Sequence, residues 1–235
     1  MTESFYKNIT ENYKAITENI QMAAEASGRK ESDITFLAAT KTVAPQAINH
    51  AIHLGLRAIG ENRVQELLDK YEAYDLRQCD LQFIGRLQTN KIKYIIDKVS
   101  QIQSVDSMGQ VREISRLAVK FGKKMNILIE VNIGSEESKG GVLPEKLTEF
   151  IDEAKDYEGI RINGLMAIPP ICGNKAELIE YFSRMRQYYV DIGAKKMDNV
   201  LMNCLSMGMS SDYVEAIECG ATMVRIGSSL FGSRN

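Results

Sequence analysis

Lys41 is the residue of this sequence best placed for covalent chemistry. It follows the mainly apolar run 35–40, which would hold the stem of its side chain against a partly desolvated wall. Such surroundings disfavour the ammonium form and lower the pKa of a lysine, and a lysine must be a free amine to attack a carbonyl. The alternative interpretation is an ordinary surface lysine that follows a strand.

Two further polar residues suit the same kind of site. Arg225 lies between apolar residues, where a permanently charged guanidinium needs a partner, either a carboxylate or the ring nitrogen of a bound cofactor. Asn62, next to Glu61, either lines a site with its amide or caps the helix that is expected to follow it. Both alternatives are compatible with the sequence.

Two segments rich in glycine and serine suit a phosphate group. They are residues 206–211, which begin with Ser206, and residues 225–229, which include Gly227 and Ser228. Small residues permit close approach and backbone N–H groups before a helix bind anions, although the same residues also turn chains and cap helices. A lysine, a phosphate site and an arginine together predict pyridoxal 5′-phosphate, whose aldehyde, phosphate and pyridine nitrogen need these three partners.

Short apolar runs alternate with longer amphipathic stretches along the chain, which predicts strands alternating with helices. The predicted strands are residues 34–39, 58–60, 81–84, 102–105, 127–131, 162–166, 200–205 and 223–226. The predicted helices are residues 3–26, 45–54, 64–71, 90–97, 109–121, 144–157, 175–191 and 213–219. Pro45 and Pro144 suit first helical turns, and Asp212 with Glu215 resembles a capping box.

This alternation predicts parallel strands joined by right-handed helical crossovers in a single domain, residues 1–235. A closed (β/α)8 TIM barrel with an extra N-terminal helix is the economical α/β fold, because it leaves no sheet edge and buries apolar strands on both faces. The competing open sheet needs a Gly-x-Gly-x-x-Gly turn after its first strand, and none follows residues 34–40. In a barrel, the polar residues described above meet at one mouth.

Composition and charge exclude several classes of partner and site. The formal charge of −2, without blocks of like charge, gives no footprint for nucleic acid or an anionic membrane. Residues 1–7 show no signal pattern and no apolar run reaches membrane-spanning length, so a cytoplasmic protein is expected. Four widely spaced cysteines predict reduced, buried thiols. His50 and His53 lack a third ligand, so no metal site is expected.

Eight longer motifs occur in a fixed order along nearly the whole chain. They are residues 38–42, 60–66, 83–91, 105–107, 130–133, 164–166, 205–210 and 224–228. These motifs resemble those of the pyridoxal phosphate homeostasis proteins, also called the YggS or PROSC family, whose barrel is similar to the N-terminal barrel of alanine racemase.

The resemblance assigns roles to the candidate residues. It implies that Lys41 forms a reversible Schiff base with pyridoxal 5′-phosphate, that Arg225 faces the pyridine nitrogen, and that Asn62 lines the cofactor pocket. The residues implied to hold the phosphate are Ser206, Gly227 and Ser228. Gln82 stands where the family often has a histidine, so a role that depends on an imidazole is not expected here. Lys139, in a matching loop, is hypothesised to be a second amine that helps to pass the cofactor in or out.

The resemblance implies a carrier or buffer of the cofactor in intracellular homeostasis, without racemase turnover. An arginine at the pyridine nitrogen disfavours its protonation and weakens the ring as an electron sink. Racemases of this type also use a tyrosine from a second domain, which this chain is expected to lack because it stops at Asn235. The alternatives are a low-activity amino-acid racemase and a sugar-phosphate isomerase. The expected partners are the cofactor and pyridoxal phosphate-dependent apoenzymes, and the expected state is a monomer.

Overall fold

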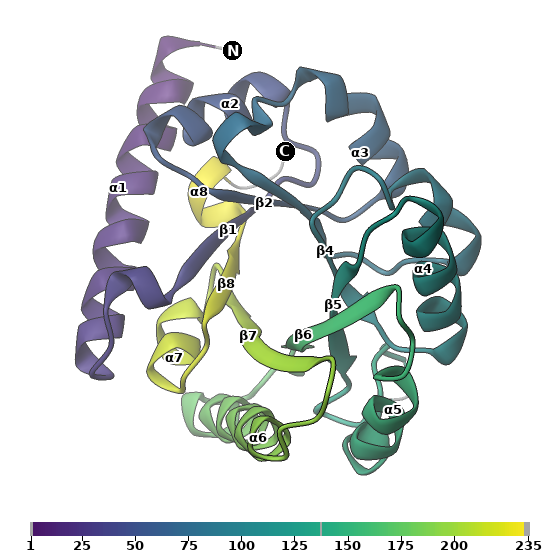
Figure 1. Ribbon diagram of the computed structural model, residues 1–235. Coiled ribbons are helices and arrows are strands. Elements are labelled where there is room, and N and C mark those ends of the chain that lie inside the picture. Colours follow the sequence, from purple (N-terminus) through teal and green to yellow (C-terminus); the bar gives the residue numbers. More distant parts are fainter. Residues whose placement is uncertain (1, 137, 233–235) are drawn as a thin grey trace.

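Eight parallel strands form a closed barrel in the computed structural model, which describes residues 2–136 and 138–232. The strands follow one another around the barrel in chain order, and β8 closes it by pairing with β1 (Figure 1). They are β1 (Thr35–Ala39), β2 (Ala58–Glu61), β3 (Asp80–Phe83), β4 (Gln101–Val105), β5 (Met125–Val131), β6 (Ile160–Ala167), β7 (Val200–Met209) and β8 (Met223–Ile226). The prediction of a (β/α)8 barrel is confirmed.

Helices surround the barrel and connect consecutive strands (Figure 1). The α-helices are α1 (Glu3–Ala26), α2 (Pro45–Leu54), α3 (Val64–Lys70), α4 (Met108–Lys120), α5 (Leu147–Ala154), α6 (Lys175–Ala194), α7 (Tyr213–Glu218) and α8 (Ser228–Phe231). Short 3₁₀-helices are η1 (Glu31–Asp33), η2 (Tyr71–Ala73), η3 (Leu76–Gln78), η4 (Thr89–Tyr94) and η5 (Pro144–Lys146). The extra N-terminal helix is present as predicted.

Two predicted helices differ in the structure: one contains no α-helix, and the other begins as a 3₁₀-helix. The stretch 90–97 forms η4 followed by turns, and its fully buried Ile92 and Ile95 are three residues apart, the spacing that aligns side chains in a 3₁₀-helix. In the stretch 144–157, Pro144 opens η5 rather than an α-helix, and α5 begins only at Leu147.

Three corrections concern the carboxyl end of the barrel. The strand β7 continues to Met209, so part of the predicted loop 206–211 is strand, and the short helix α8 was not predicted. Asp212 does precede α7, but its carboxylate accepts a hydrogen bond from the N–H of Met209 and makes no side-chain cap of that helix. The capping-box prediction for Asp212 is therefore wrong.

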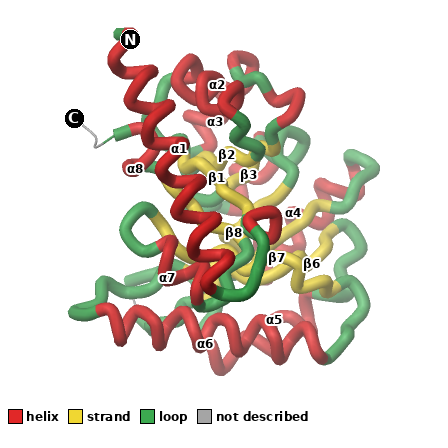
Figure 2. The backbone as a smooth tube through the Cα atoms, turned by 90° about the vertical axis from the view of Figure 1, so that its left-hand side faces the viewer, coloured by secondary structure: helices red, strands yellow, loops and turns green. Residues whose placement is uncertain are grey.

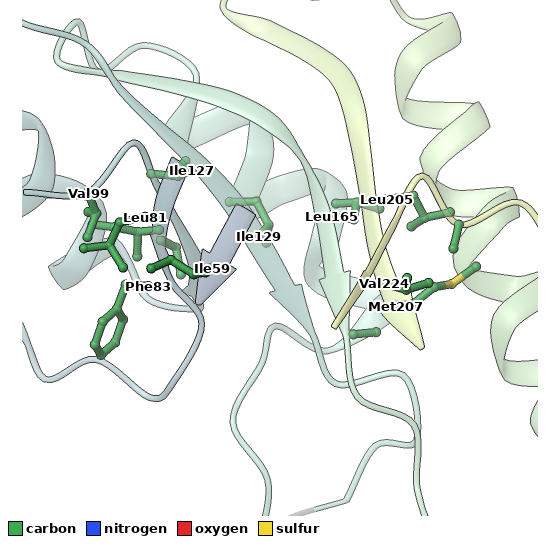
Figure 3. Close-up of a cluster of buried hydrophobic side chains, with 14 of the residues drawn as sticks. Ile59, Leu81, Phe83, Val99, Ile127, Ile129, Leu165, Leu205, Met207 and Val224 are labelled. Carbon is green, nitrogen blue, oxygen red and sulfur yellow. The ribbon is translucent and has the colours of Figure 1, made fainter. Parts of the chain in front are cut away.

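Side chains alternate between two cores. Those facing into the barrel include Leu37, Ala58, Leu128, Met166 and Met223. Those facing outward pack beneath the helices, and Figure 3 shows several of them on neighbouring strands. The labelled residues of that outer core include Ile59, Phe83, Ile129, Leu165 and Val224. This alternation decides which residue at each strand end faces the mouth.

The first helix, α1, lies along the outside of the barrel, across the side that faces the viewer in Figure 2. It contacts α2, α7 and α8. Its buried residues, Ile9, Ile16, Ile20, Ala23 and Ala24, recur at helical spacing, so one apolar face packs against these elements. The helix thus covers the seam where the first and last strands pair.

The four cysteines are all free thiols. Cys79 and Cys204 are buried, whereas Cys172 and Cys219 are partly exposed, so the prediction of buried thiols is right for two of them. Within the described residues, no helix is long and apolar enough to cross a bilayer. The same residues contain no group of three or more His, Cys, Asp and Glu side chains that could hold a metal ion.

Candidate cofactor site

Lys41 lies at the rim of the barrel, two residues beyond the end of β1. Leu37 and Ala39 belong to the core that faces the barrel interior, so the alternation along the strand directs Lys41 toward the mouth. It lines a cavity of about 290 Å³ together with Gly227 and Ser228. The structure therefore brings three of the predicted site residues into one cavity.

The two threonines that flank this lysine are held by groups beneath the rim. Thr40 is fully buried; its hydroxyl donates to Glu61 Oε1 at 2.8 Å, and its carbonyl accepts from Lys70 Nζ at 3.1 Å. The N–H of Thr42 donates to Glu66 Oε2 at 2.8 Å. The main chain is thus fixed on both sides of the lysine that is predicted to hold the cofactor.

Lys70 is the centre of this supporting network. Only 13% of its side chain is exposed, and its Nζ lies 3.0 Å from Glu61 and 3.2 Å from Glu66. Burial and the neighbouring Glu61 keep the pKa of Tyr74 far above its usual value, so its hydroxyl donates to Glu61 Oε1 at 2.6 Å. Burial opposes ionisation of Glu66, but hydrogen bonds from Thr42 and Lys70 outweigh it and lower the pKa of Glu66. Sequence reasoning missed this network.

Arg225 lies in the barrel interior with only 4% of its surface exposed. It donates from Nη1 to Ser206 Oγ at 2.5 Å and from Nη2 to the carbonyl of Ala167 at 3.0 Å. Both acceptors are neutral, and burial lowers the pKa of Arg225 to about 10, although Glu130 acts in the opposite sense. A buried cation with neutral partners is incompletely compensated, which suits a site that receives a polar group of a ligand.

Ser206 belongs to β7 rather than to a loop, and it is fully buried. Its hydroxyl donates to Gln103 Oε1 at 2.7 Å while accepting from Arg225. Gln103 in turn donates to Gln82 Oε1 at 2.7 Å. The hydrogen bonds of Ser206 to Gln103 and Arg225 orient the guanidinium. The direct phosphate contact that the resemblance implies for Ser206 stays a prediction.

The chain of hydrogen bonds continues toward the other end of the barrel. Gln101 donates to Gln82 Oε1 at 3.1 Å, Asn163 donates to Gln101 Oε1 at 2.8 Å, and Asn203 donates to Asn163 Oδ1 at 3.2 Å. Side-chain amides from β3, β4, β6 and β7 therefore form one continuous polar path beneath the site. Buried polar side chains that satisfy one another specify a single arrangement.

Ser210 is a further site residue, missed as an individual although it lies in the predicted segment 206–211. Its Oγ accepts from the N–H groups of Gly227 at 3.1 Å and of Ser229 at 3.3 Å. Two backbone donors after β8 thus already converge on one oxygen atom, beside the cavity that Lys41 lines. Converging N–H groups of this kind also bind phosphate oxygens.

Asn62 lies in the loop between β2 and α3. The helix α3 is preceded by Arg63 as its cap residue, so the alternative that Asn62 caps it is wrong. The carbonyl of Asn62 lies so close to Gly85 that a Cβ there would be 2.1 Å from the oxygen, which explains the glycine. Asn62 lines a second cavity, of about 740 Å³, together with Arg86, rather than the cavity that Lys41 lines.

Glu130 is a titratable group that sequence reasoning did not single out as a site residue. It lies on β5, and burial together with the nearby Asp106 raises its pKa to about 7, against the opposing effect of Arg225 and Arg86. A carboxyl group with such a pKa can exchange a proton near neutral pH. The signal in the sequence was a charged residue within the otherwise apolar run 127–131.

The comparisons with known proteins agree with this geometry. The chain matches the sequence family described as alanine racemase, N-terminal domain, over residues 12–235. A pyridoxal phosphate homeostasis protein from Aquifex aeolicus is 45% identical over 229 residues, which are 97% of this chain and 99% of that protein. The Escherichia coli protein of the same name is 33% identical over 231 residues, 97% of each chain. This chain belongs to the pyridoxal phosphate homeostasis protein family.

Solved structures show the same fold. A Bifidobacterium adolescentis protein, described as an unknown protein, superposes with a TM-score of 0.93 at 33% identity, covering 98% of this chain and 97% of that one. PipY of Synechococcus elongatus, solved with pyridoxal phosphate bound, gives 0.80 at 30% identity and covers 92% of this chain and all of PipY. Alanine racemase of Clostridium difficile gives 0.76 at 16% identity over 57% of its length, a likeness of the fold alone.

Two residues noted in connection with the pyridoxal phosphate homeostasis family have defined surroundings. Gln82 lies in the buried part of the amide chain and accepts two hydrogen bonds, so an amide suits this position. Lys139 forms an ion pair with Glu136 and donates to the carbonyl of Pro169 at 3.3 Å. Its role as a second amine stays a prediction.

Proposed function

We propose that this chain binds pyridoxal 5′-phosphate reversibly at Lys41 and acts as a carrier or buffer in the homeostasis of that cofactor. The observation that carries the proposal is the single cavity shared by Lys41, which follows β1, and by Gly227 and Ser228, which follow β8. The strand β8 also carries the incompletely compensated Arg225. The name of the curated relatives and the cofactor bound to PipY support it.

Each residue has a part in this proposal. The amine of Lys41 would hold the aldehyde carbon in a reversible covalent bond, and Arg225 would face the pyridine nitrogen. The family resemblance also gives Asn62 a place beside the ring, although Asn62 lines the larger cavity and not the one that Lys41 lines. The phosphate is held by Gly227 and Ser228, with Ser210 beside them. Ser206 orients Arg225 from below. When bound, the cofactor supplies an electrophilic aldehyde and an electron-withdrawing ring.

The proposed position of Arg225 favours storage of the cofactor over catalytic turnover of an amino acid. A guanidinium facing the pyridine nitrogen disfavours protonation of that nitrogen, and an unprotonated ring stabilises a carbanion poorly. The buried Ser206, itself held by Gln103, keeps Arg225 in this orientation. We therefore propose a protein without racemase activity, formed by one domain (residues 1–235), present as a monomer in the cytoplasm, which delivers the cofactor to apoenzymes and does not bind nucleic acid.

One observation favours a second candidate, a low-activity amino-acid racemase. Such a reaction needs an acid or base beyond Lys41, and Glu130 is placed in the field of Arg225 with a pKa near neutrality. Racemisation of any member of a panel of amino acids, lost in both Lys41→Ala and Glu130→Gln, would favour this candidate over a carrier.

The first test is a visible absorption spectrum of the purified protein, followed by borohydride reduction and peptide mass mapping. A yellow protein whose fixed adduct maps to Lys41 is expected. The exposed Lys146, which pairs with Glu149, provides the control. Lys146→Ala should keep the adduct at residue 41, whereas Lys41→Ala should lose it. A colourless protein that takes up no added cofactor would contradict the proposal.

A further inference from the structure

A basic groove opens on the β2 and β3 side of the barrel mouth. Its volume of about 740 Å³ is more than twice that of the cavity lined by Lys41. Three cationic side chains line it, those of Arg63, Arg86 and Lys91, together with the ring of Tyr94. None of these residues has a part in the function proposed above.

The position of the groove ties it to the cofactor site. Asn62 lines the groove, and its main chain packs against Gly85, so the loops after β2 and β3 meet there. Arg86 directly follows Gly85, and it acts with Arg225 on the pKa of Glu130, which burial raises and both arginines lower. The electrostatic field of the groove therefore reaches the barrel interior.

The positive charge of the groove is largely uncompensated. Arg63 comes within 3.8 Å of Glu66, but Glu66 already accepts hydrogen bonds from Thr42 and Lys70. Among the described residues, no carboxylate oxygen lies within 4.0 Å of the charged nitrogens of the other two cations, on Arg86 and Lys91. Unpaired cations that share a concave surface attract anions.

The lining suits an anion that also carries an aromatic ring. Guanidinium and ammonium groups bind phosphate through charge-assisted hydrogen bonds. The amides of Gln65 and Gln88 add hydrogen-bonding groups, while Val64, Leu68 and the Tyr94 ring provide an apolar wall. Aromatic rings pack on tyrosine rings and on guanidinium planes.

We propose that this groove binds a second phosphorylated vitamin B6 molecule, beside the cofactor held at Lys41. The inference rests on the proposed function, because it supplies a waiting position for a molecule about to enter or leave the site. Arg86 and Lys91 bind the phosphate, and Tyr94 contacts the ring.

The test uses holoprotein in which borohydride has fixed the cofactor to Lys41, titrated calorimetrically with pyridoxamine 5′-phosphate at low salt. This probe carries an amine in place of the aldehyde, so it cannot react with lysines. One equivalent should bind. Pyridoxamine, which lacks the phosphate, and orthophosphate, which lacks the ring, should each bind at least about tenfold more weakly.

Matched variants locate the site. Lys91→Gln and Arg86→Gln should each weaken binding of the probe by about tenfold or more. Lys93 lies in the same short helix η4 and faces the same Tyr94 ring, with its Nζ 4.9 Å from the ring centre, but it does not line the groove. The variant Lys93→Gln loses the same charge and should bind as the unaltered protein does.

Several outcomes would overturn the inference: no binding to the fixed holoprotein, equal loss in Lys91→Gln and Lys93→Gln, or orthophosphate binding as tightly as the probe. Failure of the proposed function is separately visible, because borohydride would then fix no cofactor at Lys41. In that case the titration is made with the protein as purified, and the lysine pair still reports on the groove.

Discussion

Two cations with little solvent exposure, one largely buried and one almost fully buried, lie near the barrel mouth in opposite surroundings. Lys70, on the β1–β2 side, contacts two carboxylates, Glu61 and Glu66. Arg225, on β8, donates only to neutral oxygen atoms in the hydrogen bonds described above. Carboxylates of the protein neutralise the charge of Lys70. The charge of Arg225 has no such partner in its hydrogen bonds, so it can attract a polar group of a ligand.

The difference separates support from binding. A buried charge whose partners all belong to the protein stabilises one arrangement of the chain, and removing a partner exposes its full desolvation cost. Lys70 fixes the main chain around Lys41 in this way. A buried guanidinium with neutral partners costs folding free energy that a ligand can recover on binding. The surroundings of Lys70 therefore suit a supporting role, and those of Arg225 suit the binding of a ligand.

The largest effect is expected from Lys70→Met. This substitution leaves the fully buried Glu61 without its cation, so the free energy of unfolding should fall by about 3–5 kcal/mol. Urea unfolding followed by circular dichroism measures the change. The exposed Lys146 supplies the control, since Lys146→Met should change stability by less than about 0.5 kcal/mol. A loss for Lys70→Met no larger than for the control would remove the contrast between the two cations.

Arg225→Met should behave in the opposite way. Since no carboxylate loses its ion pair, the free energy of unfolding of the cofactor-free protein should change by less than about 1.5 kcal/mol, or even rise. Affinity for pyridoxal phosphate should fall by at least about tenfold, measured by the visible absorption of the bound form. A variant that unfolds as easily as Lys70→Met while keeping its affinity would reverse the assignment of the two cations.

The pH dependence of stability tests the surroundings of Arg225, because Glu130 lies close enough for each to affect the pKa of the other. Burial and Asp106 raise the pKa of Glu130 to about 7 from the ordinary value of 4.5, so the folded protein retains a proton that the unfolded chain has released. The contribution of Glu130 to stability is therefore greatest below pH 4.5 and falls as the pH rises toward 7.

Glu130→Gln tests this dependence, because glutamine keeps the shape and stays neutral. The stability of the variant minus that of the unaltered protein should be larger at pH 7.5 than at pH 5. Urea unfolding midpoints measured at the two pH values would show the difference. Glu113 provides a contrast, since its hydrogen bond to Arg116 lowers its pKa. Glu113→Gln should produce no such gain. Parallel curves for the unaltered protein and Glu130→Gln would show that Glu130 titrates normally.

The sequence predicted the barrel because a local pattern, apolar runs alternating with amphipathic stretches, determines it. Lys41, Gly227 and Ser228 could be predicted as neighbours because strand ends of a barrel share one mouth. The surroundings of Ser206 could not, since they depend on where β7 ends and on its irregular pairing with β8. The sequence predicted that Arg225 needs a polar partner. It did not predict that the hydrogen-bond acceptors would be a serine hydroxyl and a backbone carbonyl.

The hydrogen-bonded networks show why the rest was not predictable. Gln82 and Gln103 contact each other only because β3 and β4 pair in one register, and a shift of one residue would turn either amide outward. Lys70 reaches Glu61 from the far end of α3, nine positions along the chain. Periodicity gives the face of each residue but not its partner on another element. The network residues were therefore recognisable as buried polar groups at most.

The smallest effect is expected at Ser210, which lies beside the residues proposed to hold the phosphate, Gly227 and Ser228. Ser210→Ala removes the oxygen that accepts from the N–H groups of Gly227 and Ser229, so the free energy of unfolding should fall by about 1 kcal/mol. Because bound phosphate would satisfy the same two donors, saturating orthophosphate or cofactor should recover part of this loss. In Ser229→Ala, which loses a hydrogen bond to the Ser210 carbonyl but no acceptor of these donors, the ligand should give no such extra recovery. Equal stabilisation of both variants by the ligand would mean that the donors after β8 do not bind the phosphate, and that the ligand's contribution on this side comes from Arg225 alone.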